Sequence, residues 1–234
     1  MLSSHHIVKS YDDELTQLRA IIVAMGHMAA GEVASAIQSL TEQDTDLASQ
    51  VIAGDHAVDD AEHQVNELTV RLLALRSPVA DDLRTVVASL KMASELERVA
   101  DLAVNIAKRV IVLSQFPPLP SVHGIARMGE AVVALVEAVV SAFAASDVTE
   151  ALAVWERDMD VDDQCSALFR ELLTYMMENP RNITACSHLM FVAKNIERVG
   201  DHATNIAEII HYRVVGEPLR TPRPKGDTSS FRLE

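Results

Sequence analysis

The sequence predicts an all-α protein made of two tandem, pseudo-symmetric three-helix bundles. Three observations predict this fold class: an aliphatic composition, a helical spacing of the apolar residues, and an internal repeat of the whole pattern. Hydrophobic residues make up 49% of the 234 residues and aromatic residues only 4%, which is typical of packed helices. With 8 glycines and 8 prolines, the chain also lacks the many turns of an all-β protein.

The internal repeat is clearest in two segments that lie 100 residues apart. The segment MASELERVADLAVNIA at 92–107 aligns with VAKNIERVGDHATNIA at 192–207. Further upstream the offset becomes 103, where DHAVD at 55–59 aligns with DMDVD at 158–162. A near-constant offset over such a length indicates a duplicated unit, because each copy must build the same helices and the same core.

Each copy is expected to contain three helices. Asp44 and Asp147 are candidate N-caps, while Ser77-Pro78 and Asn179-Pro180 each end one helix and begin the next. Within the third and sixth helices, apolar residues recur at alternating spacings of three and four, as in bundles whose helices cross at shallow angles. The six expected helices lie near residues 10–40, 45–76, 79–115, 123–145, 148–178 and 182–214.

The expected domain organisation follows from the same pattern. Residues 1–115 form the first repeat and residues 125–214 the second, joined by the proline-rich linker FPPLPSVHG at 116–124. The two bundles are joined either end to end or side by side. After the second repeat, residues 215–234 contain three prolines and no apolar stripe, so this tail is expected to be disordered.

The charge of the chain narrows the classes of partner. Lys and Arg total 20 against 34 Asp and Glu, a net charge of −14, which disfavours binding to nucleic acid. Such a surface suits cations or basic protein patches. No signal peptide is visible, and the apolar window at 126–145 is interrupted by charges, which argues against a membrane span. With only Cys165 and Cys186, a soluble cytoplasmic protein is expected.

Pairs of carboxylates at i,i+4 spacing mark the second and third helix of each repeat. A like-charged pair at this spacing destabilises an isolated helix by about 0.2–0.5 kcal/mol, yet it occurs at aligned positions in both repeats. The pairs are Asp55/Asp59, Glu97/Asp101, Asp158/Asp162 and Glu197/Asp201. On the last helix Asn205 and Glu208 extend the stripe and are candidate additional ligands.

Paired carboxylates on adjacent helices predict a metal site in each repeat. Hard cations prefer oxygen ligands, so magnesium, calcium, manganese and iron are candidates, and zinc also accepts carboxylates. The alternative is a solvated acidic face without a bound ion. The sequence does not choose between these ions.

Three segments resemble the PhoU family of bacterial phosphate-transport regulators. They are ELERVAD at 95–101, NIERVGDHATNIAE at 195–208 and LRSPVADDLR at 75–84. The resemblance runs from about residue 10 to residue 214 and implies two three-helix bundles, with multinuclear metal clusters on E(D)-x-x-x-D motifs of adjacent helices. By position, one site would comprise Asp55, Asp59, Glu97 and Asp101, and the other Asp158, Asp162, Glu197 and Asp201.

The resemblance also implies a function. The expected protein is a negative regulator of phosphate uptake and of the phosphate-starvation (Pho) response, which links the ATPase subunit of a phosphate ABC transporter to a sensor histidine kinase. It is expected to be a cytoplasmic homodimer that reaches the membrane only through its partners. The chain departs from its own second repeat at Ala100, Leu102 and Lys108, which align with Gly200, His202 and Glu208. The first site is therefore expected to hold fewer ions or to bind them more weakly.

Two other function classes compete with this interpretation. A helical metal-storage or structural protein would use the same carboxylates. A di-iron oxidase would need Glu-x-x-His on two helices, but Ala100 and Gly200 follow Glu97 and Glu197 at that spacing. No glycine-rich phosphate loop is present, so nucleotide hydrolysis is not expected. The interpretation as a regulatory adaptor implies a protein that is not an enzyme. His63 and His202 are candidates for an occasional metal contact.

Overall fold

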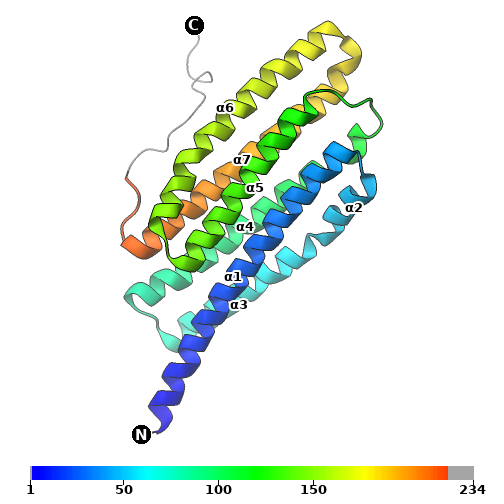
Figure 1. Cartoon of the computed structure of the whole chain (residues 1–234). Coiled ribbons are helices and arrows are strands. Elements are labelled where there is room, and N and C mark those ends of the chain that lie inside the picture. The colour runs from blue at the N-terminus through cyan, green and yellow to red at the C-terminus, as the bar shows by residue number, and fades with distance from the viewer. Residues whose placement is uncertain (1, 221–234) are drawn as a thin grey trace.

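The chain folds into long helices that lie side by side (Figure 1). This computed structural model describes residues 2–220, with side chains from Tyr11 onward, and none of these residues lies in a β-strand. The elements are α1 (Leu2–Glu42), α2 (Thr45–Gly54), α3 (His56–Arg76), α4 (Ala80–Leu113), α5 (Val122–Ala145), α6 (Val148–Glu178), the 3₁₀ helix η1 (Pro180–Asn182) and α7 (Ile183–Val215). The all-α prediction is confirmed.

Two bundles form the molecule, and their long axes run together rather than end to end. α1 to α4 form the first bundle and α5 to α7 the second, with α1 packed against α5 and α4 against α7. In Figure 1 the turn between α3 and α4 and the turn between α6 and α7 lie at opposite ends of the molecule. The two repeats therefore run in opposite directions along a shared interface.

Glycines allow α1 and α5 to approach closely at this interface. A Cβ atom on Gly129 would lie 2.6 Å from Cγ1 of Ile37, and a Cβ atom on Gly26 would overlap the side chain of Val140. Gly26 and Gly129 are 103 residues apart in the sequence, as are Ile37 and Val140. The contact is thus the same in both directions, which is the pseudo-symmetry that the internal repeat predicts.

The second expected helix is broken, so the prediction of one helix over 45–76 is wrong at this point. α2 ends at Gly54 and α3 begins at His56, whereas α6 runs without interruption through the aligned region. Glycine costs about 1 kcal/mol relative to alanine inside a helix, and the second repeat has Arg157 where the first has Gly54. Across the break, the amide of Asp59 still donates to the carbonyl of Asp55 at 3.3 Å, so this acidic pair keeps its helical spacing.

The helix ends otherwise follow the sequence signals. Oδ1 of Asp44 accepts hydrogen bonds from the amides of Asp46 and Leu47, both at 2.9 Å, which confirms this N-cap. Oδ1 of Asp147 caps α6 in the same way. The largest difference is at the start of the chain, where α1 begins at Leu2 rather than near residue 10.

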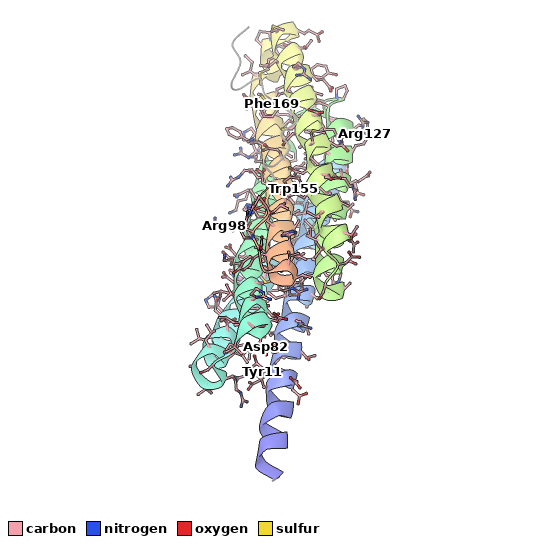
Figure 2. All side chains as sticks on the ribbon, turned by 90° about the vertical axis from the view of Figure 1, so that its left-hand side faces the viewer. Tyr11, Asp82, Arg98, Arg127, Trp155 and Phe169 are labelled. Atoms are coloured by element: carbon pink, nitrogen blue, oxygen red, sulfur yellow. The ribbon has the colours of Figure 1, made fainter. Side chains whose placement is uncertain are left out.

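Tyr11 and Asp82 join α1 to the start of α4. They lie close together at the lower end of the molecule in Figure 2. Burial raises the pKa of Tyr11 to about 12, with a further contribution from the Asp82 carboxylate. Tyr11 also packs against the hydrophobic core, and this packing ties the beginning of α1 to the first bundle.

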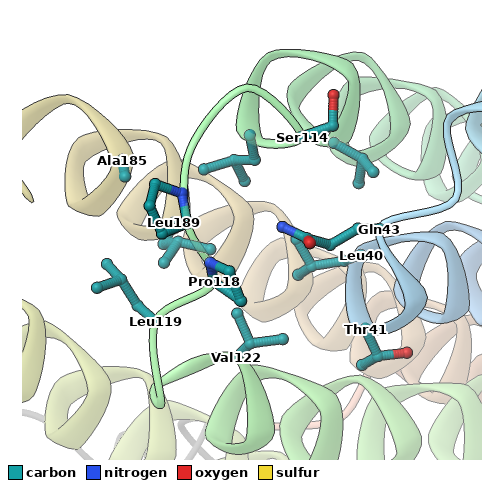
Figure 3. A pocket seen from close by; sticks show the side chains of 12 residues that line it. Leu40, Thr41, Gln43, Ser114, Pro118, Leu119, Val122, Ala185 and Leu189 are labelled. Atoms are coloured by element: carbon teal, nitrogen blue, oxygen red, sulfur yellow. The ribbon is translucent and has the colours of Figure 1, made fainter.

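The apolar seams of α4 and α7 form the centre of the core. Every seam residue of α7 is at most 2% exposed. These residues are Leu189, Val192, Ile196, Val199, Ala203, Ile206 and Ile210. The linker also packs on this core, because Phe116 and Leu119 contact it. Between the end of α1, the linker and the start of α7 lies a cavity of about 30 Å³, enough for a single water molecule (Figure 3).

The chain leaves the second bundle after Val215. Gly216 takes a positive φ of 82°, which ends α7, and Leu219 then packs against the core. Residues 221–234, where most of the expected disordered tail falls, lie outside the described residues.

In the part of the chain that the structure describes, two helices are long and apolar enough to cross a membrane by length and composition alone. They are α1 from Tyr11 to Glu42 and α5, and 44% and 50% of their most apolar windows are buried inside the protein. Since α1 and α5 pack against each other, the bundle core itself accounts for their apolar character.

Candidate metal centres

The acidic pairs of the first repeat face one another across two helices. Asp55 and Asp59 lie at the start of α3, while Glu97 and Asp101 lie on α4, which packs against α3. Burial raises the pKa of Asp55, and the charges of Asp59 and Asp101 raise it further. Burial and then Asp101 likewise raise the pKa of Glu97. We call these four residues the first centre.

Glu32 on α1 adds a carboxylate that was not among the predicted site residues. Its Oε2 atom is buried and has no hydrogen-bond partner among the described residues. Burial raises the pKa of Glu32 to about 7, with contributions from Asp55 and Asp59. The repeat itself carried a signal for this residue, because the aligned position in α5 is the core residue Leu135. A glutamate at a position that the fold makes apolar is an indication of special chemistry.

The second repeat places its pairs on α6 and α7, with Asp158 most deeply buried. We call Asp158, Asp162, Glu197 and Asp201 the second centre. Asp158 is only 1% exposed, and a Cβ atom on Gly200 would lie 2.5 Å from its Oδ1. The missing side chain at Gly200 therefore leaves the room that the carboxylate occupies. In the first repeat Ala100 stands at the aligned position, and Asp55 is correspondingly only partly buried.

Lys194 supplies a positive charge to the second centre. Its Nζ lies 2.7 Å from Oε1 and 2.5 Å from Oε2 of Glu197, whose side chain is 15% exposed. Burial raises the pKa of Glu197, the lysine opposes that shift, and Asp201 and Asp162 add to it. Lys194 is not among the residues predicted from the sequence. The repeat nevertheless marks it, because the aligned residue in the first repeat is the uncharged Ser94.

The extended stripe on α7 makes contacts of its own. The side-chain amide of Asn205 donates to Oε2 of Glu95 on α4 at 2.9 Å, and Nδ1 of His202 lies 2.7 Å from the same oxygen. Glu208 instead accepts a hydrogen bond from Nε1 of Trp155 on α6 at 3.2 Å. Asn205 and His202 thus join the two repeats, while Glu208 joins α7 to α6. His63 bonds to the backbone carbonyl of Asp59 in its own helix, at 2.8 Å.

The two centres have donors that suit a hard cation, but their arrangement is open. Among the described residues, no three His, Cys, Asp or Glu side chains lie close enough together to hold a metal ion. The carboxylates influence one another's pKa across the helices without forming a closed ligand set. All-oxygen donors and the unpartnered buried oxygen of Glu32 fit a cation such as magnesium or manganese, which would require the side chains to turn toward a common point.

Comparison with known proteins identifies the family. The sequence model of the PhoU domain matches residues 22–110 and residues 125–210, one match in each bundle. The chain belongs to the PhoU family. A relative from Caulobacter vibrioides, named phosphate-specific transport system accessory protein PhoU homolog, is 47% identical over 97% of this chain and 99% of its own length. A relative of the same name from Rhizobium meliloti is 44% identical over 98% of this chain and 97% of its own.

Solved PhoU structures share the fold. The crystal structure of PhoU from Pseudomonas aeruginosa superposes with a TM-score of 0.86 at 36% identity, covering 88% of this chain and all of that one. The phosphate transport system regulatory protein PhoU from Streptococcus pneumoniae gives a TM-score of 0.84 at 26% identity, covering 90% of this chain and all of that one. The double three-helix bundle of this chain is therefore the PhoU fold.

Proposed function

We propose that this PhoU-family chain is a metal-binding regulatory adaptor of a phosphate-specific transport system. It acts as a negative regulator of phosphate uptake and of the phosphate-starvation response. The observation that carries the proposal is the match to accessory proteins of this transport system over nearly the whole of both chains. Because the shared region includes both repeats, the relatives and this chain present the same double bundle to their partners.

An adaptor needs surfaces rather than a reaction centre, and the molecule is built accordingly. The two bundles share a continuous core, so a partner at one end is held in a fixed relation to a partner at the other. We propose that the ATPase subunit of the phosphate ABC transporter and a sensor histidine kinase are these partners. The protein would work in the cytoplasm as a homodimer and reach the membrane through the transporter alone.

The proposed metal ions would neutralise part of a strongly acidic body. The net charge is −14, and eight of the carboxylates gather in the two centres. A divalent cation in each centre would hold α3 against α4 and α6 against α7, because carboxylates from both helices would share one ion. Iron, zinc, magnesium and manganese are the candidate ions.

Deletion of the gene tests the regulatory role. In medium rich in phosphate, the deletion strain should express phosphate-starvation genes, and a copy of the wild-type gene should silence them again. Capture of the full-length protein from cells should recover the transporter ATPase and a histidine kinase. Unchanged expression in the deletion strain would overturn the regulatory role. Metal binding without either partner would favour the storage or structural alternative.

Thermal unfolding tests the metal part separately. A ligand that binds only the folded state stabilises it by about 2.7 kcal/mol at a concentration one hundred times its dissociation constant. Adding manganese to metal-free protein should therefore raise Tm. The double substitution Glu197→Ala with Asp201→Ala should remove the part of this increase that comes from the second centre. If none of the four candidate ions changes the Tm of the wild-type protein, metal binding is excluded, while the proposed adaptor role is unaffected.

A further inference from the structure

The two centres differ in one respect that the repeat does not predict. In the second centre Lys194 contacts both carboxylate oxygens of Glu197. Among the described residues, no salt bridge reaches Asp55, Asp59, Glu97 or Asp101 of the first centre. His56 and Lys108 act on Asp55, and Arg98 acts on Glu97, only through their charges and without an ion pair. The second centre therefore has a lysine in direct contact with one of its carboxylates, whereas the cationic groups near the first centre form no ion pair with it.

We propose that Lys194 is the built-in counter-ion of the second centre, which an entering metal cation must displace, so that the first centre fills first. This inference rests on the metal-binding part of the proposed function. It makes Lys194 a residue that sets the order and affinity of metal binding, although its ammonium group never contacts the ion.

The geometry of Lys194 suits a counter-ion that can leave. Lys194 and Glu197 are three residues apart on α7, so their side chains share one face of the helix. The lysine side chain is 54% exposed, whereas the Glu197 side chain is only 15% exposed. The carboxylate is thus largely enclosed by the protein. The ammonium group lies at the end of a flexible, exposed side chain, which can rotate away into the solvent. Displacement moves only the exposed partner.

The first centre has the opposite balance of charge. At the position of Lys194 it has Ser94, and at the position of the core residue Leu135 it has Glu32. Glu32 brings a fifth carboxylate toward Asp55 and Asp59, and its buried oxygen lacks a hydrogen-bond partner among the described residues. A cation entering there has no ion pair to displace, and it relieves the repulsion among the carboxylates. The structure thus supports the reverse of the order expected from Lys108 in the sequence.

A metal titration of the full-length chain can separate the two centres. Trp155 is the single tryptophan of the chain, lies on α6 one turn before Asp158, and donates its hydrogen bond to Glu208. Its fluorescence therefore reports on the second centre. Calorimetry with manganese should show two binding phases in the wild type, and the tryptophan signal should follow the weaker one. Lys194→Ser should shift that weaker phase to a manganese concentration at least tenfold lower.

Matched variants exclude a general charge effect. Lys91→Ser removes the same charge from an exposed site on α4, and it should leave both phases unchanged. Lys194→Arg keeps the cation and should preserve the wild-type order. In a Glu97→Gln, Asp101→Asn background, only the second centre remains, so calorimetry measures the effect of Lys194→Ser there without relying on fluorescence. Circular dichroism checks that each variant stays folded.

The outcomes distinguish this inference from the function on which it rests. If wild-type protein binds no manganese in calorimetry or elemental analysis, the metal part of the proposed function fails, and the inference fails with it. If manganese binds but Lys194→Ser leaves the second centre as weak as Lys91→Ser does, only the role of Lys194 is overturned. The same holds if the second centre fills first in the wild type.

Discussion

Gly200 on α7 and Asp158 on α6 share one small space in the second bundle. A Cβ atom at position 200 would lie 2.5 Å from Oδ1 of Asp158 and 3.7 Å from Cγ1 of Val161. Asp158 is 1% exposed, so other protein groups enclose its carboxylate. The glycine in the NIERVGDHATNIAE segment is therefore explained by packing against a candidate metal ligand.

We expect Gly200→Ala to lower the free energy of unfolding. The substitution gains about 1 kcal/mol of helix propensity, but overpacking in a close-packed core costs about 1–3 kcal/mol, and the added Cβ would displace the buried Asp158 carboxylate. Urea unfolding of metal-free protein measures the difference. The control is Gly31→Ala on α1, where an added Cβ meets nothing within 4 Å and should stabilise by about 0.5–1 kcal/mol. Equal stabilisation by both substitutions would contradict the packing argument.

The glycines between the repeats should be equally intolerant of a side chain. A methyl group at Gly129 would meet Ile37, and one at Gly26 would meet Val140, both from the facing helix. Each alanine variant should lose about 1–3 kcal/mol of unfolding free energy, and the two losses should be similar because the contacts are related by the repeat. Thermal unfolding of both variants checks this. A large loss at one position and none at the other would show that the α1–α5 contact is not pseudo-symmetric.

Glu32 should make stability depend on pH in the metal-free protein. Its pKa rises from the usual 4.5 to about 7 in the folded chain. Between these values the native state holds a proton that the unfolded state has lost, so stability falls as the pH rises through this window and is constant above it. The total loss is on the order of 1–3 kcal/mol.

Glu32→Gln should remove this slope. Urea unfolding at several pH values, with a chelator present, compares the variant with the wild type. The variant should be the more stable protein above pH 7 and should match the wild type near pH 4.5. If the unfolding free energies of the two proteins change with pH in parallel, the slope does not come from Glu32.

Arg213 should be a large contributor to the stability of the second bundle. It is 5% exposed, and its Nη2 donates to the carbonyl of Phe143 at 3.1 Å and to Oγ of Ser146 at 2.7 Å, where α5 ends. Its guanidinium group also stacks on the Phe143 ring, 4.5 Å from the centroid. Burial lowers the pKa of Arg213 to about 10, with a smaller effect of Arg19.

We expect Arg213→Ala to cost about 2–3 kcal/mol, because α5 loses its C-terminal donor and a buried side chain is removed. Arg213→Lys keeps the charge but cannot form the planar two-acceptor contact, so it should recover less than half of the loss. Chemical denaturation of the three proteins gives the comparison. A neutral effect of Arg213→Ala would show that water replaces the arginine at the end of α5.

Part of this molecule was predictable because local chemistry decides it. The N-caps Asp44 and Asp147 bond to amides two and three residues away, so the sequence near them is sufficient. Most helix ends were placed by proline and by apolar spacing for the same reason. The break at Gly54 was missed because a single glycine inside an apolar pattern is usually tolerated.

The candidate centres divide in the same way. The four acidic pairs were visible in the sequence because the repeat aligns them. Glu32 and Lys194 were not predicted. Glu32 comes near other carboxylates only through the packing of helices, and Lys194 contacts Glu197 only because of the side-chain rotamer that it adopts. Glu32 reaches Asp55 and Asp59 only because α1 lies against the α2–α3 break.

By itself, the sequence determined a helical, duplicated chain of the PhoU family whose two halves carry aligned acidic pairs, because periodicity and repeat depend only on the order of residues. The tertiary structure alone decided that the halves lie side by side and antiparallel, and that their centres differ in charge. Those properties depend on contacts between residues far apart in the chain, such as Ile37 with Gly129 and Asp158 with Gly200. Their closeness follows from how whole helices pack, which no local pattern records.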